Sequence, residues 1–329
     1  MKKVQFIVLM IVCLLILPKP VLAEKFEISG VLEAESFYSS TDLAAGGDTN
    51  ASDITTATAE LAVGMNLHQY VHGQINLKWE EDDTDPLQFD VGTMTLGKLD
   101  GLSVTVGKAY LPFGAFNSHF VSDPITLQLG ETRESPFIIA YNQDIFTVKA
   151  GAFNGDVKKI GDDTLVDDYV VAIEVTPVEG IILGASYISD MADTDADLLS
   201  GSNFIDEVGG FSAFVSTTFG PLTVEAEYLG ALDDFASSDL DGDSDGNGDQ
   251  PRAWNVEAAY GVTDKLEAAI KYEGNDEFFT SPKDQYGVAA SYQIWDGVSA
   301  SLEYLHGNYD NSSTNDNIDI ATLKLAAEF

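Results

Sequence analysis

Apolar and polar residues alternate one by one along much of this chain. In the segment 71–80, Val71, Ile75, Leu77 and Trp79 share one parity, and the opposite parity is polar. A strand directs successive side chains to opposite faces, so the pattern predicts a strand with one apolar and one polar face. The polar positions of this segment are His72, Gln74, Asn76, Lys78 and Glu80. The same split recurs in 222–228, 254–260, 266–273 and 298–304.

Two kinds of connection join the predicted strands in turn. A very tight turn follows one strand and a long polar loop follows the next, which predicts about sixteen strands. The tight turns lie near 68–69, 99–100, 143–144, 178–179, 220–221, 263–264 and 295–296. The long loops are roughly 40–53, 81–86, 112–135, 154–167, 190–208, 232–251, 274–283 and 308–316.

This arrangement is typical of a transmembrane antiparallel β-barrel of the Gram-negative outer membrane, in which short periplasmic turns alternate with long extracellular loops. The final run, 318–329, places Leu323, Leu325 and Phe329 on one face and predicts the closing strand. A soluble β-sandwich is the alternative interpretation, but it gives no reason for sorting loops by length. We therefore predict an all-β fold, a barrel of about sixteen strands that is wide enough for a water-filled channel.

The first 23 residues have the composition of a secretory signal peptide. Lys2 and Lys3 precede a stretch, 4–17, that is apolar apart from Gln5 and is shorter than the roughly 20 residues of a membrane-spanning helix. We predict a cleaved signal peptide, 1–23, and a single barrel domain, 24–329. No later segment predicts a transmembrane helix. The first strand begins within a few residues of the predicted cut, so no plug domain is expected and any constriction must come from a loop.

The charge of the chain limits its partners. The formal net charge is -38, which excludes nucleic acid because phosphate would be repelled and no basic stripe offsets the repulsion. Hydrophobic residues make up 45% and aromatic residues 10%, too much for a disordered acidic chain. A mean hydropathy of +0.00 fits a barrel whose outward apolar residues balance inward polar ones.

The loop 112–135 has the most distinctive sequence. Its runs 107–116, which contains Pro-Phe-Gly, and 122–135, which contains Ser-Asp-Pro and Leu-Gly-Glu-Thr, resemble the signature stretch of the LbtU family of siderophore porins. The layout of signal, unplugged barrel and terminal Phe is similar over the whole mature chain. The resemblance implies an outer-membrane route for a ferric siderophore, and it implies no individual binding residues.

The same loop is the predicted constriction of the channel. Its apolar residues need a surface to pack on, which predicts that it folds into the lumen; a loop over the rim or in a subunit interface is the alternative. The predicted constriction residues are Phe113, Phe116, Asp123, Glu131, Arg133 and Glu134. The predicted lumen-lining residues are His72, Lys78, Glu80, Glu225, Glu257, Lys271 and Glu303. Inward carboxylates outnumber inward lysines, which favours cations.

One acidic loop resembles a calcium-binding loop. Asp241, Asp243 and Asp245 place carboxylates at every second position, with Gly242 and Gly246 for tight turns. The twelfth position from Asp241 is Arg252, so the bidentate glutamate of an EF-hand is absent. A weak Ca²⁺ site is one hypothesis and a flexible acidic loop without a ligand is the other. No other cofactor is predicted.

No enzymatic motif is present in the sequence, and we predict that the protein is not an enzyme. Ser118 and His119 are adjacent, but adjacency in sequence does not make a nucleophile and a base, which must converge in space.

Two pore functions and one other class are consistent with the sequence. The first is a porin that passes a ferric siderophore or a similar small solute, and the second is a general, cation-preferring diffusion porin. The third is a structural or adhesive barrel that conducts nothing. The predicted surroundings are outer-membrane lipid and lipopolysaccharide, and a homotrimer is expected only by analogy of architecture.

Overall fold

The structure is a computed structural model that describes residues 25–81, 87–99, 101–161, 163–199, 203–310 and 313–329. The predicted signal peptide, 1–23, lies outside these residues. Among the described residues, no helix is both long and apolar enough to cross a membrane.

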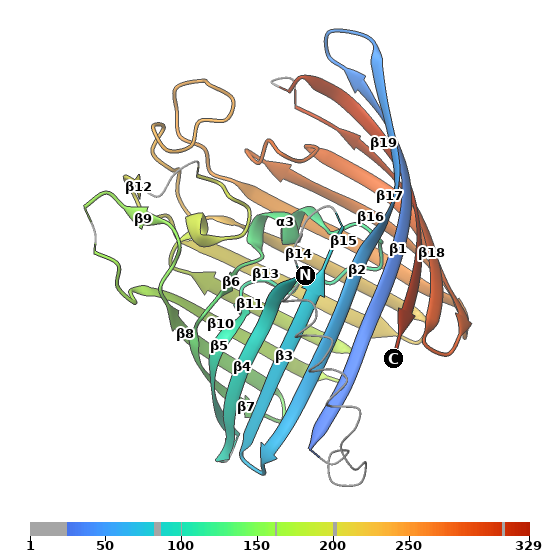
Figure 1. The fold of residues 1–329 in the computed structure, drawn as a ribbon. Coiled ribbons are helices and arrows are strands. Elements are labelled where there is room, and N and C mark those ends of the chain that lie inside the picture. Colours follow the sequence, from blue (N-terminus) through green and yellow to red (C-terminus); the bar gives the residue numbers. More distant parts are fainter. Residues whose placement is uncertain (1–24, 82–86, 100, 162, 200–202, 311–312) are drawn as a thin grey trace, which may run out of the picture.

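Sixteen strands of the described chain form one closed antiparallel sheet, as the alternation predicts. Each strand pairs with the next one in the ring, and the last pairs with the first, so the sheet closes into a barrel whose strands run obliquely (Figure 1). The strands of the ring are β1 (Phe26–Leu43), β2 (Asp48–His68), β3 (Val71–Trp79), β4 (Gln88–Leu99), β5 (Leu102–Tyr110), β7 (Phe137–Gln143), β8 (Phe146–Phe153), β10 (Asp168–Val178), β11 (Ile181–Ile188), β13 (Gly210–Phe219), β14 (Leu222–Ala231), β15 (Arg252–Thr263), β16 (Leu266–Asp276), β17 (Asp284–Trp295), β18 (Val298–Asn308) and β19 (Asn315–Glu328).

Short elements lie in the loops between these strands. One helix, α3 (Ile125–Gly130), and one 3-10 turn, η1 (Met191–Asp193), are described. The short strand β6 (Arg133–Glu134) extends the pairing of β5, and β9 (Lys158–Lys159) pairs in parallel with β12 (Asn203–Phe204). Four of the loops are named L3 (111–132), L4 (154–167), L5 (189–209) and L6 (232–251).

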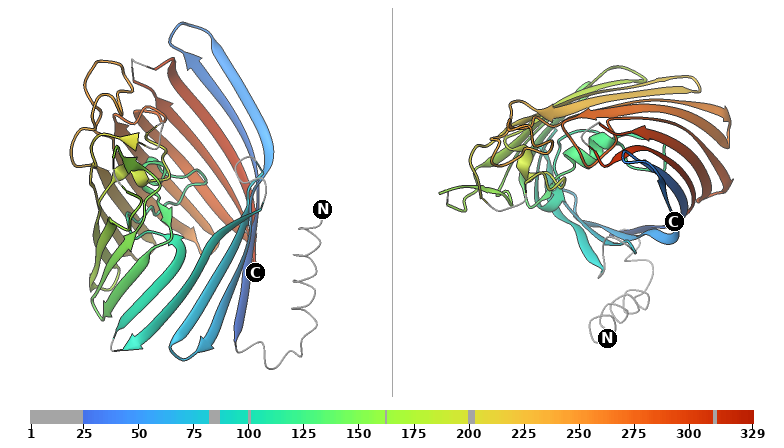
Figure 2. Two further views of the ribbon diagram at one scale, coloured as in Figure 1. Left: turned by 60° about the vertical axis from the view of Figure 1, so that its left-hand side comes forward. Right: turned by 90° about the horizontal axis from the view of Figure 1, so that it is seen from above.

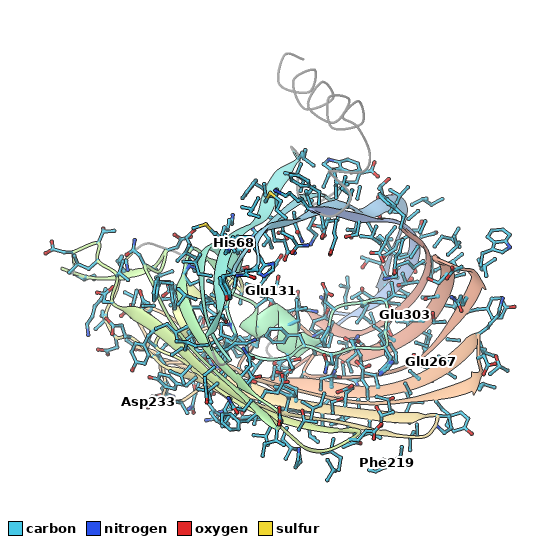
Figure 3. All side chains as sticks on the ribbon, turned by 90° about the horizontal axis from the view of Figure 1, so that it is seen from below. His68, Glu131, Phe219, Asp233, Glu267 and Glu303 are labelled. Atoms are coloured by element: carbon cyan, nitrogen blue, oxygen red, sulfur yellow. The ribbon has the colours of Figure 1, made fainter. Side chains whose placement is uncertain are left out.

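The alternation along each strand sorts its side chains between the two faces of the barrel. On β15, Val256 and Tyr260 are 45% and 51% exposed on the outer face, whereas Asn255 and Glu257 are buried on the inner face. Figure 3 shows the same sorting, with Phe219 outside the ring and Glu303 inside it. Large apolar residues are exposed on strands all around the ring, so the outer face suits lipid.

The barrel closes between β1 and β19. Their pairing runs from Val31 opposite Glu328 to Leu43 opposite Asn315, and two further hydrogen bonds of 3.1 Å join the backbones of Gly30 and Phe329. A Cβ at position 30 would lie 2.7 Å from the Phe329 ring, so the glycine makes room for this aromatic side chain at the seam.

The connections that the structure describes largely follow the prediction, with one correction; residues 82–86 of the predicted loop 81–86 lie outside the described residues. The tight turns lie at one end of the barrel, which we call the short-turn end, and the loops lie at the other, long-loop end. The prediction of a long loop at 40–53 is wrong, because β1 and β2 continue as a paired hairpin around residues 44–47, which rises above its neighbours in Figure 1. Its Ser, Thr and Asn residues have the composition of a loop, but β1 also pairs with β19 here, which holds it extended.

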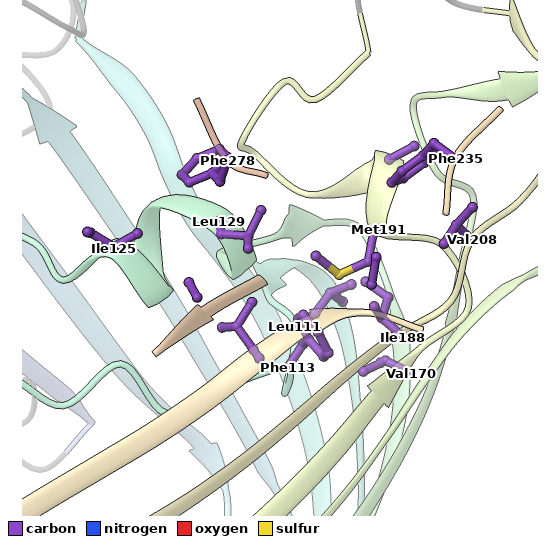
Figure 4. Close-up of a cluster of buried hydrophobic side chains, with 14 of the residues drawn as sticks. Leu111, Phe113, Ile125, Leu129, Val170, Ile188, Met191, Val208, Phe235 and Phe278 are labelled. Carbon is purple, nitrogen blue, oxygen red and sulfur yellow. The ribbon is translucent and has the colours of Figure 1, made fainter. Parts of the chain in front are cut away.

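A hydrophobic cluster lies where L3, L5 and L6 meet the strands at the long-loop end (Figure 4). Leu129 of α3 and Met191 of η1 are fully buried in it, and Phe235 of L6 joins them. The remaining buried members are Leu111, Phe113, Ile125, Phe153, Val170, Ile188, Ala192, Val208, Leu229, Ala231, Ala253 and Phe278. The loops therefore form a packed core that supports L3 from above.

The first prediction concerns this cluster. Leu129→Ala removes a fully buried side chain, so we expect the free energy of unfolding to fall by about 2–5 kcal/mol. Leu165→Ala in L4 is the control, because Leu165 is 59% exposed. Thermal unfolding of the two variants, followed by the change in electrophoretic mobility on heating, gives the comparison. Equal effects of both substitutions would contradict a structural role for the cluster.

Candidate functional site

L3 lies inside the barrel, against the wall formed by β14 to β18. The helix α3 contacts β14, β15 and β16, and seen along the barrel it lies within the ring of strands (Figure 2). The loop that the sequence predicts in the lumen therefore enters it. We call the inward side chains of β14–β18 beneath L3 the covered wall.

Carboxylates of the covered wall accept hydrogen bonds from the backbone of L3. Glu227 accepts the N–H groups of Ala115 and Phe116, each at 2.8 Å. Glu257 accepts the N–H of His119 at 2.6 Å and the Ser118 hydroxyl at 2.7 Å. An irregular loop in a lumen leaves many backbone donors without partners, and these glutamates supply charged acceptors for them.

Further along, the same arrangement holds the tip of the loop and the start of its helix. Glu303 accepts the N–H groups of Val121 and Ser122 at 2.7 and 3.0 Å and also the Ser122 hydroxyl. Glu273 accepts the N–H of Ile125, the first residue of α3, at 2.9 Å. L3 is thus attached to four strands of the wall.

A buried lysine balances part of this negative charge. The Lys271 side chain is fully buried, and its Nζ lies 3.4 Å from Glu257 Oε1 and 3.5 Å from Glu273 Oε1. The ring of Phe120 in L3 covers the ammonium, 4.7 Å from ring centroid to Nζ. Buried ions require partners of opposite charge, and here the wall and the loop provide them together.

The predicted lumen-lining residues accordingly fall into two groups. Glu225, Glu257, Lys271 and Glu303 are on the inner face, but L3 buries them, so the prediction that they line the passage is corrected. Lys78 and Glu80 remain solvent-accessible inward residues, and His72 lies near the short-turn end, with its Nδ1 2.8 Å from Asn66 Oδ1.

Solvent reaches the other half of the lumen, where ion pairs lie along the inner faces of β1, β3 and β19. Lys78 pairs with Glu80 at 2.7 Å, and Lys324 pairs with Glu33 at 3.1 Å. Their side chains are 19–27% exposed, whereas Glu257 and Lys271 of the covered wall are 0% exposed. We call this half the accessible wall.

L3 presents charged groups to the accessible wall. Asp123 is exposed, and Lys78, Lys324 and Glu33 are among its charged neighbours. Burial, followed by the nearby carboxylates of Asp195 and Asp123, raises the pKa of Glu131 to about 7. Figure 3 shows Glu131 inside the ring. Two of the predicted constriction residues thus lie beside the accessible wall.

Arg133 lies at the edge of this region and is paired. Its guanidinium donates to Asp90 Oδ1 at 2.6 Å, and it lies 5.9 Å from the centroid of the Tyr110 ring. The Tyr110 hydroxyl also donates to Asp90, at 3.0 Å. This cation is therefore neutralised locally by a wall carboxylate, as Lys78 and Lys324 are.

The other predicted constriction residues lie elsewhere. Phe113 is 1% exposed in the hydrophobic cluster, and Phe116 packs against that cluster, so neither faces the accessible wall and both predictions are corrected. Their burial follows from the need of apolar loop side chains for a dry surface. Glu134 pairs with Ala109 in the short ladder of β5 and β6, and Asp156, Asp195 and Asp168 are among its charged neighbours.

Sequence reasoning did not select two residues that attach L3. Glu227 and Glu273 have the inward parity of their strands, but nothing in the sequence distinguishes an attachment residue from a pore-lining one. The adjacent Ser118 and His119 belong to the same attachment: Ser118 donates to Glu257, and His119 Nδ1 lies 2.9 Å from Glu267.

The acidic loop is arranged differently from its prediction. Carboxylate oxygens of Asp241, Asp243 and Asp249 lie within 4.8 Å of one another. Asp245 is not in this group, and its side chain accepts hydrogen bonds from Asn247. Asp249 therefore replaces Asp245 in the geometry, and calcium binding remains a prediction.

The sequence matches a known family and curated relatives. The family model described as "Gram-negative porin" matches residues 10–329. A UPF0422 protein of Legionella pneumophila (strain Lens) is 26% identical over 293 residues, which cover 77% of this chain and 54% of the relative. A UPF0422 protein of Coxiella burnetii is 25% identical over 326 residues, covering 91% and 68%. The chain thus spans about half the length of the Legionella relative.

Solved structures with the same fold are more distant in sequence. Salmonella typhi OmpF in complex with daunomycin superimposes with a TM-score of 0.65 at 11% identity, covering 92% of this chain and 97% of OmpF. Pseudomonas putida OprB gives 0.64 at 11% identity, covering 94% and 95%. The trimer form of Vibrio cholerae OmpT gives 0.55 at 15% identity, covering 92% and 99%.

The second prediction tests the attachment of L3. Glu303→Ala removes the acceptor of two backbone N–H groups, each charge-assisted hydrogen bond being worth about 1.5–3 kcal/mol. We expect the tip of L3 to detach, with faster amide exchange at Val121 and Ser122 and a larger, noisier single-channel conductance. Glu179→Ala in a short turn is the matched control. Unchanged exchange and conductance in Glu303→Ala would refute the attachment.

Proposed function

We propose that this chain, which belongs to the Gram-negative porin family and is located in the outer membrane, is a diffusion channel that prefers cationic and neutral small solutes. The observation that carries the proposal is the charge balance between L3 and the accessible wall. Lys78, Lys324 and Arg133 are each paired with a wall carboxylate, and Asp123 and Glu131 of L3 add negative charge beside them. Excess carboxylates at a narrow passage favour cations.

The burial of the covered wall reduces the number of carboxylates that can act on a passing ion. The acidic composition alone would suggest a lumen lined by carboxylates throughout, but Glu227, Glu257 and Glu303 are occupied by donors of L3. The preference for cations is therefore assigned to two carboxylates of L3 beside the accessible wall, Asp123 and Glu131. Fewer groups set the selectivity than the sequence would indicate.

A narrower function is passage of a ferric siderophore. It rests on the resemblance of the L3 runs to the LbtU family, and the structure adds one supporting observation. The Ser-Asp-Pro run, 122–124, directly precedes α3, and the Leu-Gly-Glu-Thr run, 129–132, ends it; one residue of each motif, Asp123 and Glu131, lies beside the accessible wall. The acidic passage restricts such a ligand to a neutral or cationic ferric complex.

A homotrimer is the proposed assembly. The support is the fold shared with Vibrio cholerae OmpT, for which a trimer form is known. Chemical cross-linking in native outer membranes distinguishes a trimer from a monomer.

The third prediction separates these functions. In a planar bilayer with a KCl gradient, we expect a steady open current whose reversal potential reports a preference for K⁺ over Cl⁻. Particular neutral or cationic ferric siderophores that block the current at low concentration would support the siderophore function, and indifference to all of them would favour the general channel. A protein that inserts but stays electrically silent would refute both pores and favour the structural or adhesive barrel.

The fourth prediction concerns pH. Glu131, with its pKa raised to about 7, is mostly ionised at pH 8 and mostly neutral at pH 6, so acidification should weaken the preference for cations. A unit charge about 4 Å from an ion in water contributes about 1 kcal/mol, or roughly fivefold in local cation concentration. Reversal potentials between pH 8 and pH 6 measure the change.

Glu131→Gln is the matched variant for that titration. It should hold the low-pH selectivity at both pH values, because the amide does not ionise. A wild-type channel whose selectivity is constant from pH 8 to pH 6 would refute the role of Glu131.

A further inference from the structure

A cavity of about 300 Å³ lies beneath the first limb of L3, in the short-turn half of the lumen. Its roof is the L3 segment from Pro112 to Asn117, and its walls come from β8, β10, β11 and β13. The volume is at the lower end of the range for small-molecule sites. The charged residues of its lining are Lys149 and Glu174, and its aromatic residue is Phe214.

The two charged groups of this cavity are available to a ligand. Lys149 lies opposite Ala172 in the ladder of β8 and β10, and Glu174 lies opposite Thr147, so the two charges are diagonal neighbours on one face. Both side chains are exposed, and within the described chain neither forms an ion pair or a hydrogen bond. This contrasts with Lys78, Lys271 and Lys324, whose ammonium groups are all paired.

Phe214 provides an apolar surface between polar groups. It lies opposite Gly184 in the ladder of β11 and β13, and a Cβ at Gly184 would overlap the Phe214 ring. The glycine therefore lets the ring lie close to the sheet instead of filling the cavity. The Ser186 hydroxyl accepts a hydrogen bond from the N–H of Gly114, and the Ser216 hydroxyl donates one to Glu225. These two hydrogen bonds stabilise the lining of the cavity.

We propose that this cavity is a binding subsite for a small zwitterionic solute that carries a carboxylate, an ammonium group and an apolar body, such as an amino acid. Lys149 receives the carboxylate, Glu174 receives the ammonium group, and the apolar body packs on Phe214. Lys149 and Glu174 have no partner within the described protein, and Phe214 is packed by the protein on one side only, so all three groups can contact a ligand.

The position of the cavity supports this class of ligand over a simple anion. A solute arriving from the long-loop end first passes L3 and the accessible wall, where Asp123 and Glu131 oppose anions. A solute whose only charge is a carboxylate is repelled by these two groups before it reaches Lys149. A solute that also carries an ammonium group is not repelled in this way. This step rests on the proposed function, whereas the geometry of the subsite does not.

The fifth prediction tests binding directly. L-phenylalanine is the probe, titrated against the detergent-folded protein and followed by saturation-transfer NMR. Lys149→Gln and Glu174→Gln each remove one charge-assisted contact, so each should weaken binding by about tenfold. Phenethylamine lacks the carboxylate and 3-phenylpropanoate lacks the ammonium group, so both should bind the wild type more weakly than phenylalanine.

Lys265→Gln and Glu179→Gln, in exposed short turns, are the matched controls and should leave binding unchanged. Absence of phenylalanine binding to the wild type, or equal binding by the Lys149→Gln variant, would overturn the subsite. The change in electrophoretic mobility on heating shows that each variant is folded. Bilayer conductance of the same preparations separates the two proposals, because a folded protein that binds phenylalanine without conducting refutes the channel and leaves the subsite standing.

Discussion

The hydrogen bonds between the backbone of L3 and the glutamates of the covered wall organise the lumen of this barrel. The two partners need each other. Irregular backbone inside a lumen requires acceptors, and carboxylates shielded from water require donors. Glu227, Glu257 and Glu303 meet both requirements with distances of 2.6–3.0 Å to backbone N–H groups. The hydrophobic cluster around Leu129 then holds the loop from the long-loop end.

This attachment divides the acidic groups of the lumen into two populations. Carboxylates on β14, β15, β16 and β18 form hydrogen bonds with L3 or ion pairs with Lys271, and they stabilise the position of the loop. Those on L3 and on the accessible wall meet solvent and ions. A strongly acidic composition therefore does not translate directly into a strongly acidic passage, because the selectivity depends on which carboxylates the loop leaves uncovered.

The same geometry gives the lumen more than one environment. On one side of L3, paired ions face the solvent, as at Lys78 and Glu80. Beneath its first limb, Lys149, Glu174 and Phe214 line a separate cavity. A single loop thus separates a region suited to selecting charge from a region suited to holding a small molecule.

The sequence alone determined the barrel. Alternation such as that of Val71 to Trp79 and the ordering of tight turns are local properties of the chain, and the pairing of β3 with β2 and β4 agrees with them. It also identified L3, whose apolar residues have no place in an exposed loop. It failed at 40–53, where polar residues that resemble a loop are held extended by pairing on both sides of β1. The inward parity of Glu225 and Glu257 could be predicted, but their burial could not. Parity is a property of one strand, whereas burial beneath L3 depends on residues more than a hundred positions away, such as Asn117 and His119, and only the tertiary structure brings these together.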